Sequence, residues 1–276
     1  MAERPDLEYQ VPLLHAALAG KRITSVDVRK PIVLRLGIEG TPQSLLEGLT
    51  IASVSRRAHF VLFELGDKQM VVAPMLAGRF QFIDKKVPGD SAMLFGLNTG
   101  ETLAYRDDVQ MGKVYVIETG AWSVVPGLEK IGIDVLSKAF TFDAFRALAT
   151  KRRDQVRVFL MDKSALDSFG NAYADEVLWE AKLHPKTMMK KLSEGDLKTL
   201  HEAIVEVTKT AIKTIKAAKP PLDEKIRDFV KVRNRHGEPC PRCGDKIRRA
   251  GVHGHDTFFC PSCQPETRKT GIVSWS

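Results

Sequence analysis

The sequence lacks long apolar runs, a signal peptide and clustered aromatic residues. No stretch approaches the roughly 20 apolar residues of a membrane-spanning helix, and the N-terminus does not have the basic and then apolar pattern of a signal peptide. We therefore expect an intracellular protein, cytoplasmic or at the nucleoid, with no membrane partner. Nothing in it offers the stacking aromatics of single-strand readers, which makes an RNA-binding zinc-ribbon protein a distant alternative.

Cysteine is scarce, and all four cysteines stand within residues 240–264. They form two CxxC pairs, Cys240/Cys243 and Cys260/Cys263. Because each CxxC turn can direct two sulfurs at one tetrahedral ion, the pairs predict a four-thiolate zinc site for one structural Zn²⁺. A disulfide pair or a thioredoxin-like redox motif would be the alternatives, but neither accounts for the doubling of the pair.

A surplus of positive charge lies in the half of the chain that contains the cysteines. The net charge is +8, and residues 1–128 hold 14 lysines and arginines against 14 aspartates and glutamates, so residues 129–276 hold 28 against 20. Between the CxxC pairs stand Lys246, Arg248, Arg249, His253 and His255, opposed by Asp245 and Asp256. A basic hairpin of this kind favours a nucleic-acid phosphate backbone over an acidic protein or a membrane.

The apolar pattern predicts an α+β protein of several domains. Leu7, Val11, Leu14 and Leu18 mark one face of a leading helix, in which Pro12 predicts a kink or a late start. From residue 23 to about 118, short β-branched and aromatic runs alternate with turn signals, as in an antiparallel β-sandwich or barrel. We therefore assign residues 1–125 to an N-terminal β-sandwich domain with a helix in front.

After residue 126 the spacing of the apolar residues becomes that of helices. Thr141 can cap one helix, residues 174–183 form a short amphipathic helix, and Ser193 begins a capping box for a long helix that ends before Pro220. These elements predict a helical domain over residues 130–225. The zinc hairpin is appended to it over residues 233–270.

The N-terminus offers a reactive amine beside a carboxylate. Met1 precedes a small residue, so we expect its removal, which leaves the α-amine of Ala2 as the terminus. Such an amine has a pKa of about 7.7–8.0, so part of it is unprotonated and nucleophilic at neutral pH. Glu3 follows immediately. Taken alone, this pair carries no functional meaning.

Three segments together resemble one family. They are the run from Gly170 to Glu176 (GNAYADE) with Leu183-His184-Pro185, the segment GEPCPRCG from Gly237, and FFCPSCQ near the C-terminus. With them the chain resembles the Fpg/Nei family of DNA glycosylases over nearly its whole length. The resemblance implies a β-sandwich, a helix–two-turn–helix segment and a zinc hairpin. It also implies a monomeric base excision repair enzyme acting on duplex DNA with a damaged or abasic nucleotide.

The resemblance also implies a mechanism. The terminal amine attacks C1′ of the damaged nucleotide, the base leaves, and the resulting Schiff base permits strand cleavage by elimination, while the adjacent glutamate moves protons at the sugar. Ala2 and Glu3 take these roles here. The family's start, PELPEVE, reads AERPDLE in this chain, so a primary amine replaces proline and we expect slower elimination.

Several DNA-contacting positions depart from the family. His59 stands where the family has a phosphate-binding lysine, and it can replace that lysine only when protonated or as a neutral donor, since an unperturbed histidine has a pKa of about 6.5. Leu76 and Met111 align with the methionine and phenylalanine that fill the gap left by the flipped base; core positions are the alternative for both. Val109 replaces the arginine that reads the opposite base, so we expect reading of cytosine to be lost.

We expect this chain to retain the family's binding to the DNA backbone despite these departures. Asn171, which in the family donates to backbone phosphates, is kept, while His255 replaces the tip arginine of the hairpin. Two hypotheses follow from this mixture. The first is an active DNA glycosylase, with or without AP lyase action, whose lesion and opposite-base preference has shifted. The second is a binding protein that recognises damaged or abasic DNA without turning it over.

Overall fold

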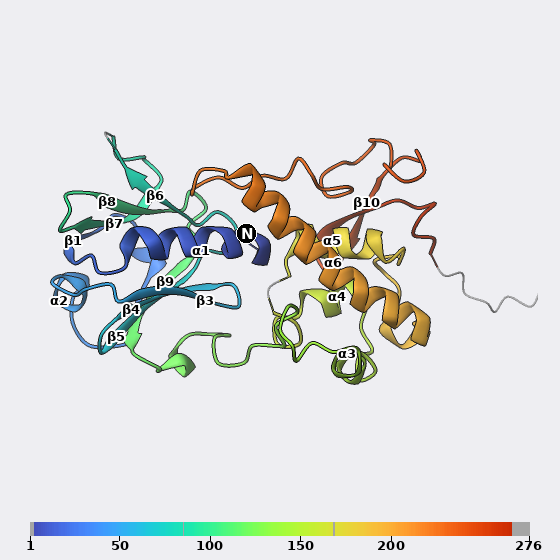
Figure 1. The fold of residues 1–276 in the computed structure, drawn as a ribbon, viewed down its shortest axis with the longest axis horizontal. Helices are drawn as coiled ribbons and strands as arrows, with labels where there is room; N and C mark the ends of the chain where they lie inside the picture. The colour runs from blue at the N-terminus through green and yellow to red at the C-terminus, as the bar shows by residue number, and fades with distance from the viewer. Residues whose placement is uncertain (1–2, 85, 168, 267–276) are drawn as a thin grey trace, which may run out of the picture. The chain divides into compact units, whose positions relative to one another are not determined.

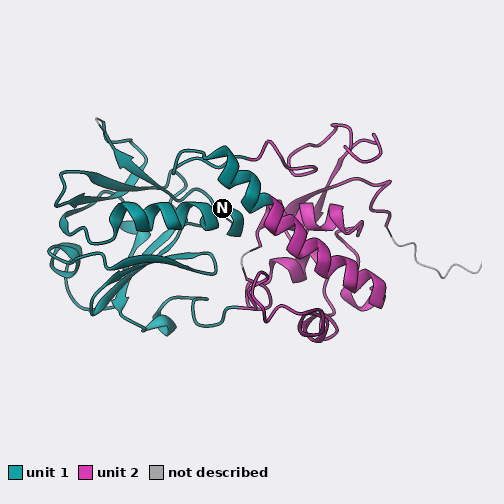
Figure 2. Ribbon diagram, in the orientation of Figure 1, with its two compact units in different colours: residues 1–131, 211–226 teal, residues 132–210, 227–276 magenta. Residues whose placement is uncertain are grey.

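The computed structural model describes residues 3–84, 86–167 and 169–266. The chain divides into two compact units, residues 1–131 with 211–226 and residues 132–210 with 227–276 (Figures 1 and 2). Over the described ranges, no helix has the length and apolar character needed to cross a bilayer.

The first helix, α1 (Arg4–Leu18), begins immediately after Glu3. The late start is therefore wrong, and Pro12 lies inside the helix. Leu7, Leu14 and Leu18 are buried along the predicted apolar face. In Figure 1 this helix runs between two sheets, and its apolar residues belong to a core that includes residues of both.

The two sheets confirm the predicted β-sandwich. One has the order β1 (Ile23–Val28), β7 (Ser91–Leu97), β8 (Thr102–Arg106) and β6 (Arg79–Ile83). The other has the order β2 (Leu34–Leu36), β9 (Lys113–Glu118), β5 (Lys68–Ala73), β4 (Phe60–Leu65) and β3 (Ser53–Arg57). The pairing is antiparallel except between β2 and β9, which run parallel. A long stretch of chain separates these two strands, and parallel pairing requires such a crossover.

The five-stranded sheet is buried on both faces near its centre. Val61 and Phe63 of β4 face the core shared with α1, whereas Phe60 and Leu62 join a second cluster with Val125 and Leu128. Because successive side chains of a strand point to opposite faces, burial on both sides explains the continuous apolar sequence of β4. Short elements complete the unit: η1 (Pro31–Val33), α2 (Pro42–Leu46) and η2 (Trp122–Val124).

The second unit is mainly helical. Its elements are α3 (Phe142–Ala149), α4 (Val156–Met161), α5 (Asn171–Glu180), η3 (Met189–Lys191), the larger part of α6 (Glu194–Ala218), β10 (Arg248–Val252) and β11 (His255–Phe259). The division between the units falls inside α6, after Thr210. The domain boundaries expected from the sequence, at residues 125, 130, 225 and 233, stay predictions.

The helix ends follow local capping rules. Thr141 Oγ1 accepts the Ala144 N–H at 3.2 Å before α3. Ser193 Oγ accepts the Asp196 N–H at 3.1 Å before α6, so both predicted caps are confirmed. Helix α5 begins three residues earlier than predicted and ends before Lys182, whose φ of 57° lies in the left-handed region.

Candidate functional site

Glu3 is fixed at the start of α1, next in sequence to the expected nucleophile. Ala2 itself lies outside the described residues. The Glu3 backbone N–H donates to Asp6 Oδ2 at 2.8 Å, and both residues are buried, with exposures of 4% and 3%. This capping interaction fixes the backbone that carries the carboxylate, because it satisfies a donor at the helix N-terminus.

A buried arginine stands beside Glu3 and was not singled out from the sequence. Arg4 is 5% exposed, and its Nη2 lies 3.1 Å from Glu8 Oε1. Arg56 of β3 contacts the same oxygen through Nε at 3.2 Å. The first two turns of α1 therefore hold carboxylates and guanidinium groups side by side. The sequence signal was the spacing of Arg4 and Glu8, four residues apart on one helix.

His59 lies in the turn between β3 and β4. It is 9% exposed, and its ring centroid lies 4.1 Å from that of Phe60. Ala58 before it has a φ of 52°, which closes the turn. The ring is therefore largely covered in this conformation, and a phosphate contact from His59 stays a prediction.

Leu76, Val109 and Met111 lie on two loops of the first unit and are exposed at 48%, 49% and 45%. Core positions, the alternative for Leu76 and Met111, are therefore wrong. Both loops pack closely against Tyr105. Its hydroxyl oxygen lies so near Gly78 and Gly112 that a Cβ atom at either position would overlap it.

A buried aspartate shapes the loop that presents Val109 and Met111. Asp107 is fully buried, and its carboxylate accepts the backbone N–H of Gln110 at 2.9 Å and of Gly112 at 2.7 Å. These bonds hold the loop in a fixed turn. The loop therefore presents the two apolar side chains to solvent from a hydrogen-bonded turn.

Asn171 is the first residue of α5 and is half-buried. Its Oδ1 accepts a hydrogen bond from Arg157 Nη2 at 2.8 Å. Gly170 precedes it in an extended conformation, so the helix begins at this asparagine. A polar side chain at a helix N-terminus lies where phosphate groups bind favourably.

Helix α5 also carries the contacts that hold the hairpin. Asp175 accepts hydrogen bonds from Thr257 Oγ1 at 2.6 Å and from the Phe258 N–H at 3.2 Å. Glu176 accepts from the backbone N–H groups of residues 231, 232 and 233 at 2.6–3.0 Å. Burial raises the pKa of Glu176, and those three N–H groups oppose the rise.

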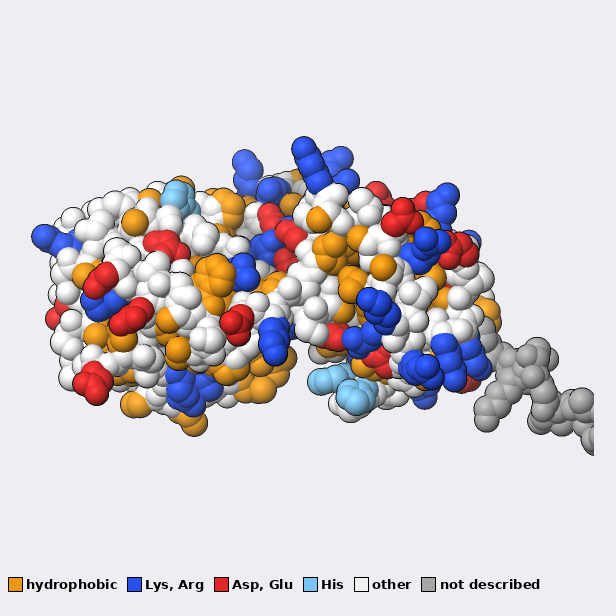
Figure 3. Space-filling view, turned by 90° about the horizontal axis from the view of Figure 1, so that it is seen from below, with side chains coloured by type: hydrophobic (Ala, Val, Ile, Leu, Met, Phe, Trp, Pro, Cys, Tyr) orange, Lys and Arg blue, Asp and Glu red, His pale blue; other side chains and the backbone are white. Residues whose placement is uncertain are grey.

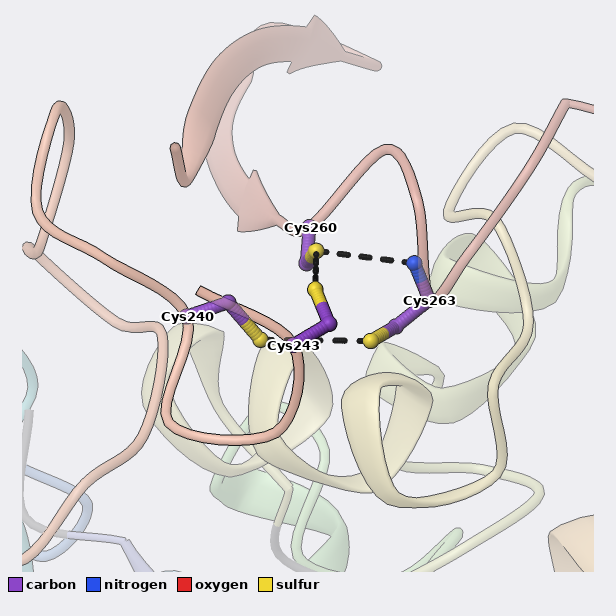
Figure 4. A group of neighbouring side chains, drawn as sticks. All are labelled: Cys240, Cys243, Cys260 and Cys263. Carbon is purple, nitrogen blue, oxygen red and sulfur yellow. Dashed lines mark hydrogen bonds between the residues drawn. The ribbon is translucent and has the colours of Figure 1, made fainter. Parts of the chain in front are cut away.

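The four cysteine sulfurs converge at the base of the hairpin (Figure 4). All lie within 4.8 Å of one another, with Cys243 Sγ 3.4 Å from Cys260 Sγ and Cys240 Sγ 3.9 Å from Cys263 Sγ. A tetrahedral ion with bonds of about 2.3 Å places its sulfurs roughly 3.8 Å apart. The sulfurs therefore fit zinc.

One of these thiols is prepared for a metal by its neighbours. Burial raises the pKa of Cys240, but a hydrogen bond from the Trp179 indole N–H at 3.3 Å and the backbone N–H groups of Arg242 and Cys243 lower it to about 6. The thiolate is the form that binds metal.

His255 begins β11 at the tip of the hairpin and is exposed, as is His253 in the turn. Both line a cleft of about 290 Å³ within the second unit, together with Arg152, Arg157, Val158, Met161 and Asp162. Arg152 pairs with Asp162 across an N–O distance of 2.6 Å. Figure 3 shows groups of lysine and arginine side chains on one face of this unit.

Three family models match successive parts of the chain. Residues 1–114 match the formamidopyrimidine-DNA glycosylase N-terminal domain, residues 131–219 its H2TH domain, and residues 237–265 the zinc finger found in FPG and IleRS. A formamidopyrimidine-DNA glycosylase of Streptococcus mutans is 30% identical over 274 residues, covering 96% of this chain and 100% of the relative. The chain belongs to the formamidopyrimidine-DNA glycosylase family.

Solved structures agree with this membership. A complex of Lactococcus lactis Fpg with DNA containing an abasic site has a TM-score of 0.86 at 28% identity, covering 96% of this chain and 100% of that one. The MutM (Fpg) protein of Thermus thermophilus has a TM-score of 0.84 at 29% identity, with coverages of 97% and 100%.

Membership in the formamidopyrimidine-DNA glycosylase family confirms the first hypothesis at the level of enzyme class. The chain is a DNA glycosylase of base excision repair with DNA as its partner, and the binding protein without turnover is not favoured. The zinc finger match and the four converging sulfurs confirm one structural Zn²⁺. The roles of individual residues remain predictions.

Proposed function

We propose that this glycosylase removes oxidised or ring-opened bases from duplex DNA through a Schiff base on the Ala2 amine. The observation that supports it most directly is the burial of Glu3 at the N-terminus of α1, immediately after Ala2. Relatives named formamidopyrimidine-DNA glycosylase indicate the lesion class. We also propose that the enzyme is a monomer working in the cytoplasm at the nucleoid.

The proposed reaction begins with the unprotonated Ala2 amine, which forms a bond to C1′ while the bond from C1′ to the base breaks; the attacking nitrogen then loses a proton and the departing base gains one. Glu3 donates a proton to the sugar ring oxygen, so the ring opens and leaves an imine. Removal of a C2′ proton then eliminates the 3′ phosphate. The Ala2 imine can lose its proton and its positive charge, whereas the iminium of a secondary amine stays charged. The Ala2 imine is therefore a weaker electron sink, and elimination is slower than base release.

The residues proposed to contact DNA divide by role. Asn171 and His255 contact backbone phosphates, with His59 as a further phosphate contact. Leu76 and Met111 fill the gap left by the flipped nucleotide, since exposed apolar side chains can insert between bases. In this arrangement residues 1–125 carry the chemistry, residues 130–225 dock the duplex and residues 233–270 form the finger.

Borohydride trapping on an abasic-site duplex tests the nucleophile. The native chain is expected to form a covalent adduct, because reduction fixes the imine. One extra residue before Ala2 should abolish the adduct and leave duplex affinity nearly unchanged. Glu3→Gln should slow base release by roughly 10²–10⁴-fold, as expected for loss of a proton-transfer group.

Intact-mass measurement must accompany the trapping, because a retained Met1 would leave Ala2 without a free amine. If the extended protein traps as well as the native one, a lysine is the nucleophile and the Ala2 assignment is wrong. If a processed native chain forms no adduct and releases no lesion, the proposed chemistry is wrong.

A further inference from the structure

A buried arginine of α4 connects three parts of the second unit. Arg157 is 1% exposed. Its Nε donates to Asp175 Oδ1 at 3.0 Å, and its Nη2 donates to Asn171 Oδ1 at 2.8 Å and to the Asp256 carbonyl oxygen at 3.0 Å. One guanidinium thus contacts the start of α5, its interior and the hairpin strand next to His255.

The contact with Asn171 decides which way that amide faces. A guanidinium has only donors, so it requires the amide oxygen and not the amide NH₂ on its side. The Nδ2 group, with its two hydrogens, is therefore directed away from Arg157. A side chain in this orientation can donate to a phosphate oxygen, whereas a flipped amide would present an acceptor to an anion.

A general structural role for Arg157 does not account for this contact. Arg233 already neutralises Asp175 through Nη1 at 2.8 Å and donates to the same Asp256 carbonyl oxygen at 2.9 Å. Arg157 duplicates both of these interactions. Of the two arginines, Arg157 is the one whose hydrogen bonds in the described structure include Asn171.

We propose that Arg157 is a positioning residue for the phosphate contacts of Asn171 and His255. It holds the Asn171 amide with its NH₂ group toward the DNA backbone, and it connects that amide to the hairpin strand that begins with His255. The inference rests on the proposed function, in which Asn171 and His255 contact phosphates. Lysine cannot replace it, since one nitrogen does not span the acceptors that the planar fork of Nε and Nη2 reaches.

A double-mutant cycle between Arg157 and Asn171 tests the proposal. The affinity of the full chain, with its zinc, is measured for a duplex containing a tetrahydrofuran abasic analogue, for Arg157→Met, Asn171→Ala and the double variant. Each single change is expected to weaken binding by about tenfold, as for loss of a hydrogen bond to a charged group. The double variant should bind no more weakly than Asn171→Ala, because Arg157 acts through Asn171.

Arg233→Met is the matched control, since it removes the shared contacts with Asp175 and Asp256 but none with Asn171. Its effect should multiply with that of Asn171→Ala. Melting temperature and zinc content are measured for every variant. If the effects of Arg157→Met and Asn171→Ala multiply, or if Arg233→Met shows the same coupling, Arg157 has a merely structural role and the proposal is overturned.

Two conservative variants keep the test decisive if Arg157→Met does not fold. Arg157→Lys retains the charge beside Asp175 and is expected to melt near the native temperature, yet to bind DNA about tenfold more weakly. Asn171→Asp retains oxygens for Arg157 but places a carboxylate toward the phosphate, so it should be as stable as the native chain and bind more weakly than Asn171→Ala. Native affinity in either variant overturns the proposal.

The native chain separates the two levels of failure. If it does not bind the abasic duplex at all, the proposed phosphate contacts fail. If it binds and Asn171→Ala weakens binding, while Arg157 shows no coupling to Asn171, the proposed function stands and only the positioning role is lost.

Discussion

At the residue scale, we expect Val109 to have the clearest effect on substrate preference. Its side chain is 49% exposed on a loop held by Asp107, and it has no hydrogen-bonding group. In the proposed complex, the base whose partner has been flipped out presents its pairing edge to this side chain. Valine can contact that edge but cannot distinguish its donors from its acceptors.

We predict that Val109→Arg introduces a preference for one opposite base, with cytosine favoured. A guanidinium can donate to the exposed acceptors of cytosine, and a good bidentate contact contributes about 1–3 kcal/mol of discrimination. Single-turnover base release from four duplexes that differ only in the opposite base measures the effect. Val109→Leu serves as the control and should keep the native, nearly uniform rates. Strong cytosine preference in the native enzyme would contradict this account.

At the scale of elements, α5 and the hairpin form one structure. Asp175 accepts hydrogen bonds from hairpin strand β11, Glu176 accepts them from the segment before the hairpin, and the Trp179 indole donates to Cys240 Sγ. The zinc site therefore stabilises the hairpin together with α5. Loss of the ion is expected to disturb the phosphate contacts and not the chemistry at Ala2.

We predict one zinc per chain, lost on Cys260→Ser, with a large decrease in DNA affinity. Cys260 is fully buried and its sulfur is one of the four that converge, so the substitution leaves three thiolate ligands. Metal analysis and duplex binding check the result. Ser262→Ala changes an exposed residue of the same CxxC pair and should retain zinc. A Cys260→Ser protein that binds DNA normally would show that the finger is dispensable.

At the scale of the whole molecule, charge determines how binding depends on salt. Residues 129–276 carry the entire positive surplus, and the hairpin residues Arg248 and Arg249 are exposed. When binding releases counterions from DNA, the logarithm of the binding constant falls linearly with the logarithm of the salt concentration. The slope is about −0.9 for each phosphate neutralised. Neutral donors add affinity without adding to that slope.

We predict that Asn171→Ala weakens binding equally on every sequence and leaves the salt slope unchanged, whereas Arg248→Ala reduces the slope by about one. The reason is that an amide positions a phosphate without displacing a cation. Duplex titrations at several salt concentrations and with unrelated sequences provide the measurement. A defect of Asn171→Ala confined to one lesion would mean that this side chain reads the base.

Local chemistry is what the sequence determined by itself. The CxxC pairs, the caps at Thr141 and Ser193 and the apolar face of α1 each depend on residues a few positions apart, so a short window contains all the information. The reactive pair of Ala2 and Glu3 stays a prediction, because it depends on removal of Met1. The run from Gly170 to Glu176 indicated the family, because its pattern is specific.

Only the tertiary structure decided which side chains are covered and which partners they meet. His59 is buried whereas Leu76 and Met111 are exposed, the reverse of their polarity, because packing of distant strands and loops determines exposure. The parallel pairing of β2 with β9 and the division of α6 between two units likewise join distant segments. Arg157 contacts Asn171 and Asp256 across 14 and 99 residues of chain, and no local pattern encodes a contact at that separation.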